Sequence, residues 1–320
     1  MNLRTFVVVT FCALSAFGNS AFGQETRPIR LLVGFPSGSA ADGAARALAD
    51  SFKESLRQTI IVDNRPGAGG RLAAELLKHS PPDGSTLLVA PMGTTIFFPV
   101  FASKLAYDPW IDFVHISQMA TLRLAFAIEA GTPAKSMKDY VAWVKANPAK
   151  ASFGSAGAGT PPHFLGIMIG QAAGFELTHV PYKGGPPLVT DMLGRHMPAG
   201  VATVTDFAEL HRAGKVRILA IGGNLRAAGL PDVPTFKDLG YDIDGMTWIG
   251  LHAPAGVPPT LVERLASAVA AAMRKPEIQA RFLKLGFDPT GTSPEQFMRI
   301  MQNDRVKWEP IIRASGFKEE

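Results

Sequence analysis

The sequence predicts an α/β protein with two domains. Apolar runs rich in Val, Ile and Leu alternate along the chain with amphipathic stretches at helical spacing. The strand-like runs are apolar throughout, which is typical of parallel strands covered by helices on both faces. A chain of 320 residues with 47% hydrophobic content is long for one core and suits two.

The expected strands and helices follow one another in a regular order. Strands are expected at 29–35, 59–64, 85–91, 124–130, 151–155, 177–182, 216–223 and 248–254. Helices are expected at 42–57, 69–79, 136–146, 162–173, 186–194, 206–213, 260–273, 276–285 and 294–314. Pro and Gly cap or interrupt many of the helical stretches, which indicates where they end.

Residues 1–23 have the pattern of an export signal. Arg4 supplies the positive charge, 6–17 form an apolar run, and small residues lead to a cleavage site at Gly23/Gln24. The run is shorter than the roughly 20 apolar residues that span a membrane. Cys12, the one cysteine of the chain, lies within it without the residues that precede a lipoprotein cleavage site. We therefore expect a cysteine-free mature protein in the periplasm.

The charged residues argue against nucleic-acid binding. The formal net charge is +5, and basic residues are scattered among acidic ones without a cluster or interleaved aromatic side chains. None of the seven histidines pairs with another at the i, i+4 spacing of a helical zinc site. We expect no metal site, no cofactor and no nucleic-acid partner. The small positive charge favours anionic solutes weakly.

Two distant loops share one design. "VGFPSGSAADGAARAL" (33–48) and "SFGSAGAGTPPHFLGIMIG" (152–170) each run from a strand through a Gly/Ser loop into a helix of small or apolar residues. Ligands of open α/β sheets bind beyond the carboxyl ends of strands, where such loops lie. Helix N-termini there offer unpaired N–H donors and about half a positive charge. We expect the loops to face each other across an interdomain cleft that favours a carboxylate. Asp42 can equally be an ordinary helix cap.

Eight stretches of the chain follow one family pattern in order and spacing. They are "PIRLLVGFPSGSAADGAAR" (28–46), "VDNRPGAGG" (62–70), "PDGSTLL" (82–88), "LAYDPWIDF" (105–113), "ASFGSAGAGTPPH" (151–163), "HVPYKGGPP" (179–187), "LPDVPTFKDLG" (230–240) and "LHAPAGVPP" (251–259). Together they resemble the Bug (Bordetella uptake gene) receptors of tripartite tricarboxylate transporters. The resemblance implies a periplasmic-binding-protein-like fold of two α/β domains, with crossing strands at the hinge and an interdomain ligand cleft. We expect 24–124 plus 249–320 to form domain 1 and 125–248 to form domain 2.

The resemblance also implies a function without catalysis. Such a receptor captures a small carboxylate-bearing solute, an organic or aromatic acid, and delivers it to integral-membrane permease subunits; we expect a monomer. Loop N–H groups, hydroxyls and ordered waters would hold the carboxylate. The ligand-binding positions carried over are Phe35, Ser37, Gly38, Ser39, Asp42, Met92, Thr94, Ser155, Gly157, Thr160, His163, Tyr182 and Lys183.

Three positions depart from the family pattern. Ala158, Pro198 and Ala202 stand where relatives often carry polar residues, although Thr203 lies close to the last of them. These changes argue against a receptor that needs a side-chain acceptor for an amino group. They favour a plain or aromatic carboxylate.

Two enzyme classes compete with the receptor. A periplasmic hydrolase could use Ser155 and His163, but "FGSAG" lacks the Gly-x-Ser-x-Gly spacing of a nucleophile elbow. A dinucleotide-binding enzyme would use Gly67 and Gly69, but Leu72 stands where the third glycine belongs. Both patterns are therefore weak evidence for an enzyme.

Three further residues each allow two interpretations. His163 can line the cleft or be structural. Lys183 can contribute charge at the cleft mouth or be a solvated turn residue. We expect Trp248 to pack at the hinge rather than stack on a ligand.

Overall fold

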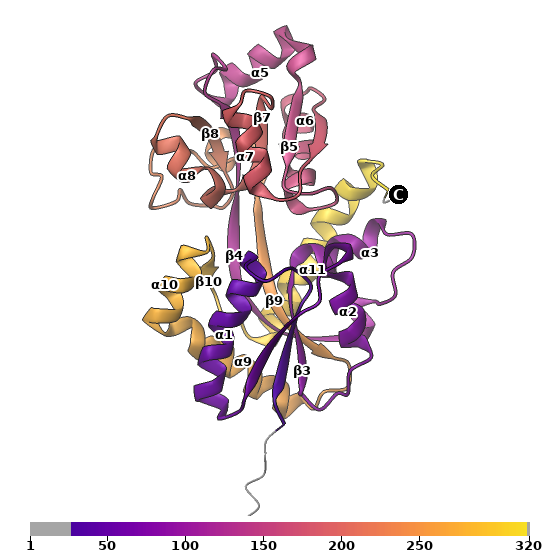
Figure 1. The fold of residues 1–320 in the computed structure, drawn as a ribbon. Coiled ribbons are helices and arrows are strands. Elements are labelled where there is room, and N and C mark those ends of the chain that lie inside the picture. Colours follow the sequence, from indigo (N-terminus) through magenta and orange to yellow (C-terminus); the bar gives the residue numbers. More distant parts are fainter. Residues whose placement is uncertain (1–26, 319–320) are drawn as a thin grey trace, which may run out of the picture.

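The computed structural model describes residues 27–318 of the chain, so the predicted export signal lies outside the described residues. The chain forms two α/β domains joined by two long strands, β4 (Phe113–Glu129) and β9 (Met246–Pro254) (Figure 1). Within the described part, ten strands make one continuous sheet, and β4 and β9 are neighbours near its middle.

Domain 1 contains the first and last elements of the described chain. Besides parts of β4 and β9, its elements are β1 (Ile29–Val33), α1 (Ala40–Leu56), β2 (Ile60–Asn64), η1 (Ala68–Gly70), α2 (Arg71–Lys78), β3 (Thr86–Pro91), η2 (Gly93–Phe97), α3 (Phe98–Phe101), α4 (Pro109–Asp112), α9 (Pro259–Arg274), α10 (Pro276–Lys284), β10 (Asp288–Pro289) and α11 (Pro294–Ala314). Of these, η2 is a π-helical turn.

Domain 2 is formed by the middle of the chain together with the second part of β4. Its elements are α5 (Met137–Ala146), η3 (Pro148–Lys150), β5 (Ser152–Ser155), α6 (Pro161–Ala173), β6 (Thr178–Pro181), α7 (Gly185–Leu193), β7 (Ala199–Thr203), α8 (Val204–Arg212), β8 (Val216–Ile221) and η4 (Lys237–Leu239).

Strand β4 changes partners as it passes from one domain to the other. Its residues 113–123 pair with β9, and its residues 124–129 pair with β7 and β8. The domain boundaries that we placed at 124/125 and 248/249 remain a prediction.

The expectation of parallel strands is correct for only part of the sheet. β1 pairs in parallel with β2 and β3, and β5 pairs in parallel with β6 and β7. β4 and β9 are antiparallel to their neighbours, because the chain enters domain 2 along one and returns along the other. The expected strand 124–130 covers only the second part of β4, since polar residues interrupt the apolar pattern of the first part.

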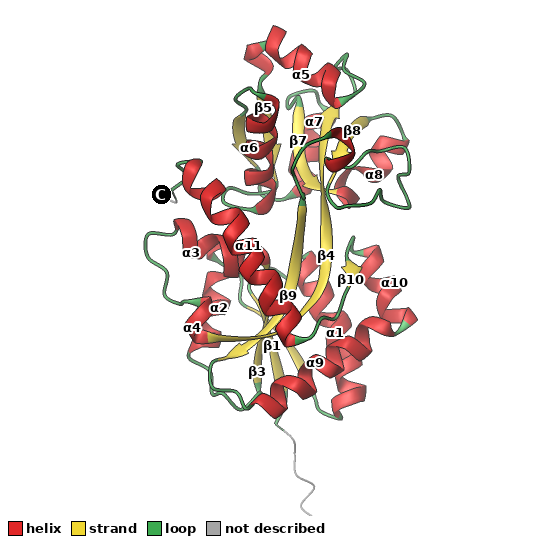
Figure 2. Cartoon of the chain, turned by 180° about the vertical axis from the view of Figure 1, so that it is seen from behind, coloured by secondary structure: helices red, strands yellow, loops and turns green. Residues whose placement is uncertain are grey.

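Helices cover both faces of each half of the sheet. In domain 1, α1, α9 and α10 bury one face around Leu31 and Leu251, and α2 covers the other around Leu88. Domain 2 has separate clusters around Phe126 and Ile218. A fifth cluster joins the domains, because α11 begins in domain 1 and ends beside α6 (Figure 2).

The helix starts follow simple capping rules. Ser39 caps α1, and proline opens α4, α6, α9, α10 and α11, where its missing N–H costs no helical hydrogen bond. Among the described residues, no helix combines the length and the apolar character needed to cross a membrane.

Candidate functional site

A cavity of about 540 Å³ lies between the two domains. The segments that follow β1, β3, β5 and β6 reach its wall, as does Thr203 at the end of β7, so the cavity lies at the carboxyl ends of these strands. This is where open α/β sheets bind ligands. The crossing strands contribute Leu122, Leu124, Thr247, Trp248 and Ile249.

The loop from β1 to α1 is held by a buried carboxylate. Asp42 is 2% exposed, and its Oδ2 accepts hydrogen bonds from the Gly38 amide (2.9 Å) and from Arg46 Nε (2.8 Å). Its Oδ1 accepts from Asn64 Nδ2 at 2.9 Å, and the same amide group of Asn64 donates to the Phe35 carbonyl at 3.0 Å. Burial opposes ionisation of Asp42, but these hydrogen bonds outweigh it and hold its pKa below the ordinary value. Asp42 therefore fixes the loop as an anion.

Two backbone amides at the start of α1 are free to bind a ligand. Ser39 Oγ accepts from the Asp42 amide at 3.3 Å, and the Ser39 carbonyl accepts from the Gly43 amide at 2.9 Å. The first two helical residues, Ala40 and Ala41, line the cavity, and within the described chain their N–H groups have no acceptor. A helix N-terminus with such donors favours an anion.

The segment after β3 forms a second part of the domain 1 wall. Thr94 lines the cavity, and its carbonyl accepts a 2.6 Å hydrogen bond from the buried Tyr107 hydroxyl. Met92 packs instead into the apolar cluster around α11. Gly34 and Gly70 pack closely, since a Cβ on Gly34 would lie 2.3 Å from the Gly70 Cα. The close contact between Gly34 and Gly70 places loop 67–70 against the loop from β1 to α1.

The loop from β5 to α6 is fixed by a neutral network. Ser155 is fully buried, and its Oγ lies 2.7 Å from His179 Nε2 and 3.0 Å from the Gly157 carbonyl oxygen. The ring of His163 stacks on that of His179 with centroids 3.8 Å apart, and His163 Nδ1 accepts from the Gly159 amide at 3.2 Å. Burial lowers the pKa of His163 to about 3 and that of His179 to about 4. Both imidazoles are therefore neutral near pH 7.

The N-terminus of α6 differs from that of α1. Its first two residues, Pro161 and Pro162, line the cavity but have no N–H to donate. Its N-cap Thr160 donates its hydroxyl to the Gly157 carbonyl at 2.7 Å instead of capping the helix. The first two residues of α6 therefore supply none of the unpaired N–H donors that we expected at this helix start.

The loops after β6 and β7 complete the domain 2 wall. The Tyr182 hydroxyl donates to Asp191 at 2.8 Å, and burial together with this carboxylate raises the pKa of Tyr182 to about 12. Lys183 is exposed, and of the lining residues within 27–318 it alone is charged. Thr203, beside the family departure at Ala202, lines the cavity and caps α8 together with Asp206.

The structure separates the predicted site residues that line the cavity from those that do not. Those that line the cavity are Phe35, Ser39, Thr94, Gly157, Thr160, Tyr182 and Lys183. Ser37 and Gly38 lie on the exposed side of the first loop, outside the lining, and the Gly38 amide is already bonded to Asp42.

Four predicted site residues are buried behind the cavity wall. Asp42, Met92, Ser155 and His163 do not line the cavity, and each is engaged in internal contacts. In this structure they lie behind the lining residues, and ligand contact by these four stays a prediction. Ligand contact by the seven lining residues remains a prediction.

Several lining residues were missed in the sequence. Leu122, Thr247 and Phe287 lie far apart in the chain, and only strand pairing and packing bring them together. Trp248 packs edge-on against Phe297 as expected of a hinge residue, and its Nε1 donates to Asp304 at 2.7 Å, but it also reaches the cavity. Thr203 was noted in the sequence only as a polar neighbour of Ala202, and the structure makes it the last residue of β7.

The geometry gives little support to a hydrolase. Ser155 contacts His179 rather than the predicted His163, and the buried hydroxyl does not reach the cavity. In residues 27–318, no group of three or more His, Cys, Asp or Glu is placed to hold a metal ion.

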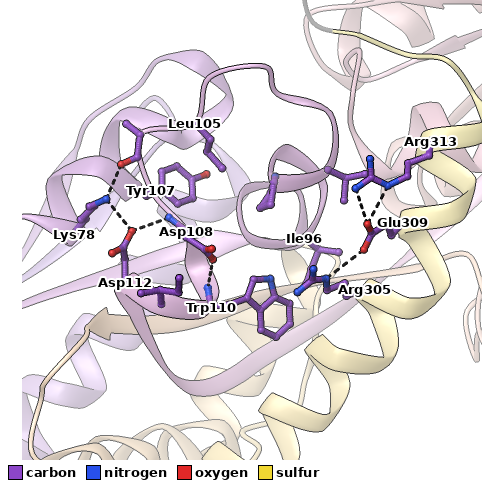
Figure 3. Close-up of a pocket in the computed structure, with 14 residues that line it drawn as sticks. Lys78, Ile96, Leu105, Tyr107, Asp108, Trp110, Asp112, Arg305, Glu309 and Arg313 are labelled. Atoms are coloured by element: carbon purple, nitrogen blue, oxygen red, sulfur yellow. Dashed lines mark hydrogen bonds and ion pairs between the residues drawn. The ribbon is translucent and has the colours of Figure 1, made fainter.

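A second pocket of about 680 Å³ lies on domain 1 between α11 and the segment from Ile96 to Asp112 (Figure 3). Its cationic side chains are paired: Lys78 lies 3.0 Å from Asp112, and Glu309 bridges Arg305 and Arg313. The opposing charges within this pocket therefore satisfy one another. The interdomain cavity differs, because it combines free amides with a single cation.

Comparison with known proteins gives the chain its family. A sequence model described as "Tripartite tricarboxylate transporter family receptor" matches residues 44–317. The chain belongs to this family. The eight motifs that resembled Bug receptors are thereby explained, and the resemblance is confirmed.

Relatives of the receptor match it over most of its length. A Cupriavidus necator protein, "UPF0065 protein in gbd 5'region", is 34% identical over 290 residues, which cover 91% of this chain and 88% of that protein. The periplasmic binding protein BugD has a TM-score of 0.78 at 28% identity, covering 92% of this chain and 99% of BugD. R. palustris Rpa4515, solved with adipate, has a TM-score of 0.81 at 26% identity, covering 92% and 98%. These structures confirm the periplasmic-binding-protein-like fold, and the family consists of binding proteins rather than enzymes.

Proposed function

We propose that this receptor captures one small carboxylate-bearing solute between its domains and delivers it, chemically unchanged, to the membrane permease subunits of a tripartite tricarboxylate transporter. The observation that carries the proposal is that Ala40 and Ala41 line the cavity and that their backbone amides have no acceptor within the described chain. Among the described residues that line this cavity, none is acidic. The relative solved with adipate, a dicarboxylate, supports the same ligand class.

Capture involves closure of the two domains around the solute. Strands β4 and β9 connect the two domains. Bending of these strands therefore brings the β5–α6 loop toward α1. Lys183 and Thr160 then approach the anion from domain 2. Closure buries the carboxylate, and burial strengthens its hydrogen bonds to the α1 amides.

Thermal unfolding in the presence of candidate ligands tests the proposal. Mono-, di- and tricarboxylates, aromatic acids and amino acids are compared with neutral sugars and peptides. A true ligand at a hundredfold excess over Kd adds about 2.7 kcal/mol to the free energy of unfolding. Calorimetry then gives the affinity, and mass spectrometry of the released ligand shows whether it is unchanged. Stabilisation by neutral sugars or peptides, with none by any carboxylate, would contradict the proposal.

Delivery from the periplasm requires export. We propose that residues 1–23 are removed and that the mature, monomeric receptor begins near Gln24. Intact-mass analysis of a periplasmic fraction checks the N-terminus, and light scattering checks the monomer. A membrane-bound form that retains residues 1–23 contradicts this part of the proposal.

A further inference from the structure

The floor of the interdomain cavity is an apolar surface with one polar atom. We define the floor as Leu122, Leu124, Thr247, Ile249 and Phe287, all of which line the cavity. Leu122 lies opposite Thr247 in the pairing of β4 with β9. Side chains of directly paired residues share one face of a sheet, so Thr247 and Leu122 face the same way.

Neighbouring residues on β9 confirm which face this is. Ile249 belongs to the core cluster on the α1 side of the sheet, and Leu122 packs against the same cluster. Trp248 belongs to the cluster around α11 on the opposite side. Because side chains alternate along a strand, Thr247 shares the face of Ile249, on the side where α1 bounds the cavity.

The hydroxyl of Thr247 has no partner within the described chain. The residue is 8% exposed, and no hydrogen bond to its side chain is formed by residues 27–318. The Thr247 oxygen is accessible, unlike the enclosed and unpaired hydroxyls of Ser51 and Thr95. An accessible, unpaired hydroxyl on a residue of the cavity wall is available to an occupant.

Charged groups are poorly matched to the floor. Lys183, which comes from the β6–α7 loop, is the one charged lining residue in the part of the chain that the structure describes, and no described Asp, Glu, Asn or Gln lines the cavity. A second carboxylate or an ammonium at the floor would lose its hydration without gaining a partner. A neutral oxygen can instead accept from Thr247 or donate to it.

We propose that the ligand is a monocarboxylate whose apolar body carries one uncharged oxygen substituent, a hydroxyl or carbonyl group, that bonds to Thr247. This inference rests on the proposed function, because it takes the carboxylate to lie at the start of α1. Phe35, Phe98 and Phe287 supply the apolar surface that covers the body of the ligand. Thr247 is then a specificity-determining residue.

Two matched sets of acids test the ligand class by calorimetry. Benzoate, 4-hydroxybenzoate and terephthalate share an aromatic body; hexanoate, 6-hydroxyhexanoate and adipate share an aliphatic one. In the set whose body fits, we expect the hydroxy acid to bind about tenfold tighter than the unsubstituted acid, which corresponds to one neutral hydrogen bond. It should also bind at least tenfold tighter than the diacid.

Variants of Thr247 separate the hydroxyl from the shape of the site. Thr247→Val keeps the shape and should weaken hydroxy-acid binding about tenfold, to the level of the unsubstituted acid, whose affinity stays unchanged. Thr247→Ser should keep the preference, which guards against a folding defect. Thr95→Val is the matched control, because Thr95 is also buried with an unpaired hydroxyl but does not line the cavity.

The outcomes separate this inference from the proposed function. Tightest binding by terephthalate or adipate overturns the inference and leaves a carboxylate receptor standing. An unchanged preference in folded Thr247→Val also overturns it. If none of the six acids binds, the inference is overturned, and the wider ligand panel decides the proposed function independently.

Discussion

The loops that begin α1 and α6 share a sequence design but differ in what they offer a ligand. α1 opens with Ala40 and Ala41, whose amides are free at the cavity wall. α6 opens with Pro161 and Pro162, which have no N–H groups. Domain 1 is thus equipped to anchor an anion, whereas domain 2 offers shape and a single cation. Two helix starts at corresponding places are therefore not two equivalent anion sites.

The supports behind the two loops differ in charge as well. Asp42, with Arg46 and Asn64, holds the first loop through an ionised carboxylate. Ser155 and His179 hold the second through neutral groups. The two domains should therefore respond differently to substitution and to acid, which allows the comparison to be tested.

The largest effect on stability is expected from Asp42→Ala. The substitution leaves the Gly38 amide and the Asn64 side chain without their acceptor, so the free energy of unfolding should fall by about 2–3 kcal/mol. Asp42→Asn keeps an oxygen acceptor and should cost about 1 kcal/mol. Urea unfolding measures both. A loss below about 0.5 kcal/mol in Asp42→Ala would show that the carboxylate does not hold the loop.

A smaller effect is expected from Ser155→Ala. His179 Nε2 and the Gly157 carbonyl lose a partner, so the free energy of unfolding should fall by about 1–2 kcal/mol. Affinity should change less than about threefold, because Ser155 does not line the cavity. Ser51→Ala is the control, since the buried Ser51 hydroxyl has no partner to lose. A tenfold loss of affinity in Ser155→Ala would restore Ser155 as a direct ligand contact.

The effect that is smallest near neutral pH is a change in the pH dependence of stability. His163 and His179 bind protons below about pH 4 in the folded state but near pH 6.5 when unfolded. Between these values the unfolded state holds more protons, so stability falls as the pH is lowered from 6.5 toward 4. The buried His115 and His252 act in the same direction. Asp42 acts later, since its contribution is lost only as the pH falls through its lowered pKa.

His163→Phe isolates the contribution of domain 2 to this pH dependence. It keeps an aromatic ring and removes one titrating group, so the slope of unfolding free energy against pH should decrease by up to about 1.4 kcal/mol per unit. Unfolding in urea at several pH values between 4 and 7 measures the slope. An identical slope in the variant would mean that His163 is already protonated in the folded protein.

The sequence predicted the parts of the site that depend on local pattern. Continuous apolar runs with Gly and Pro between them located β1, β3, β5 and the helices α1 and α6, and ligand binding at strand ends placed the cavity. The helical turns η2 and α3 after β3 were not predicted. Seven of the predicted site residues line it, among them Phe35 and Thr160. Lining residues in such loops can be predicted from the sequence, because the pattern that marks them involves residues close together in the chain.

The remainder depends on contacts between distant segments. Thr247 meets Leu122 through antiparallel pairing, and Ser155 meets His179 across two parallel strands, which no local pattern encodes. The first part of β4 carries polar residues because it crosses between domains, so its apolar signal is weak. The sequence "TPP" does show that the first two residues of α6 lack N–H groups, although the loop otherwise shares the Gly/Ser design of the loop before α1.

The most direct test removes one backbone N–H donor from the start of α1 by placing a proline there, as at the start of α6. Ala40→Pro deletes the amide at the first helical position, where proline is tolerated, and Ser39 already has the extended backbone that precedes proline. For the tightest-binding carboxylate, calorimetry should show a Kd ten- to a hundredfold higher, with unfolding free energy within about 1 kcal/mol of wild type. Pro161→Ala, the reciprocal control, should leave Kd within about threefold. Wild-type affinity in folded Ala40→Pro would contradict the anchoring of the ligand by α1.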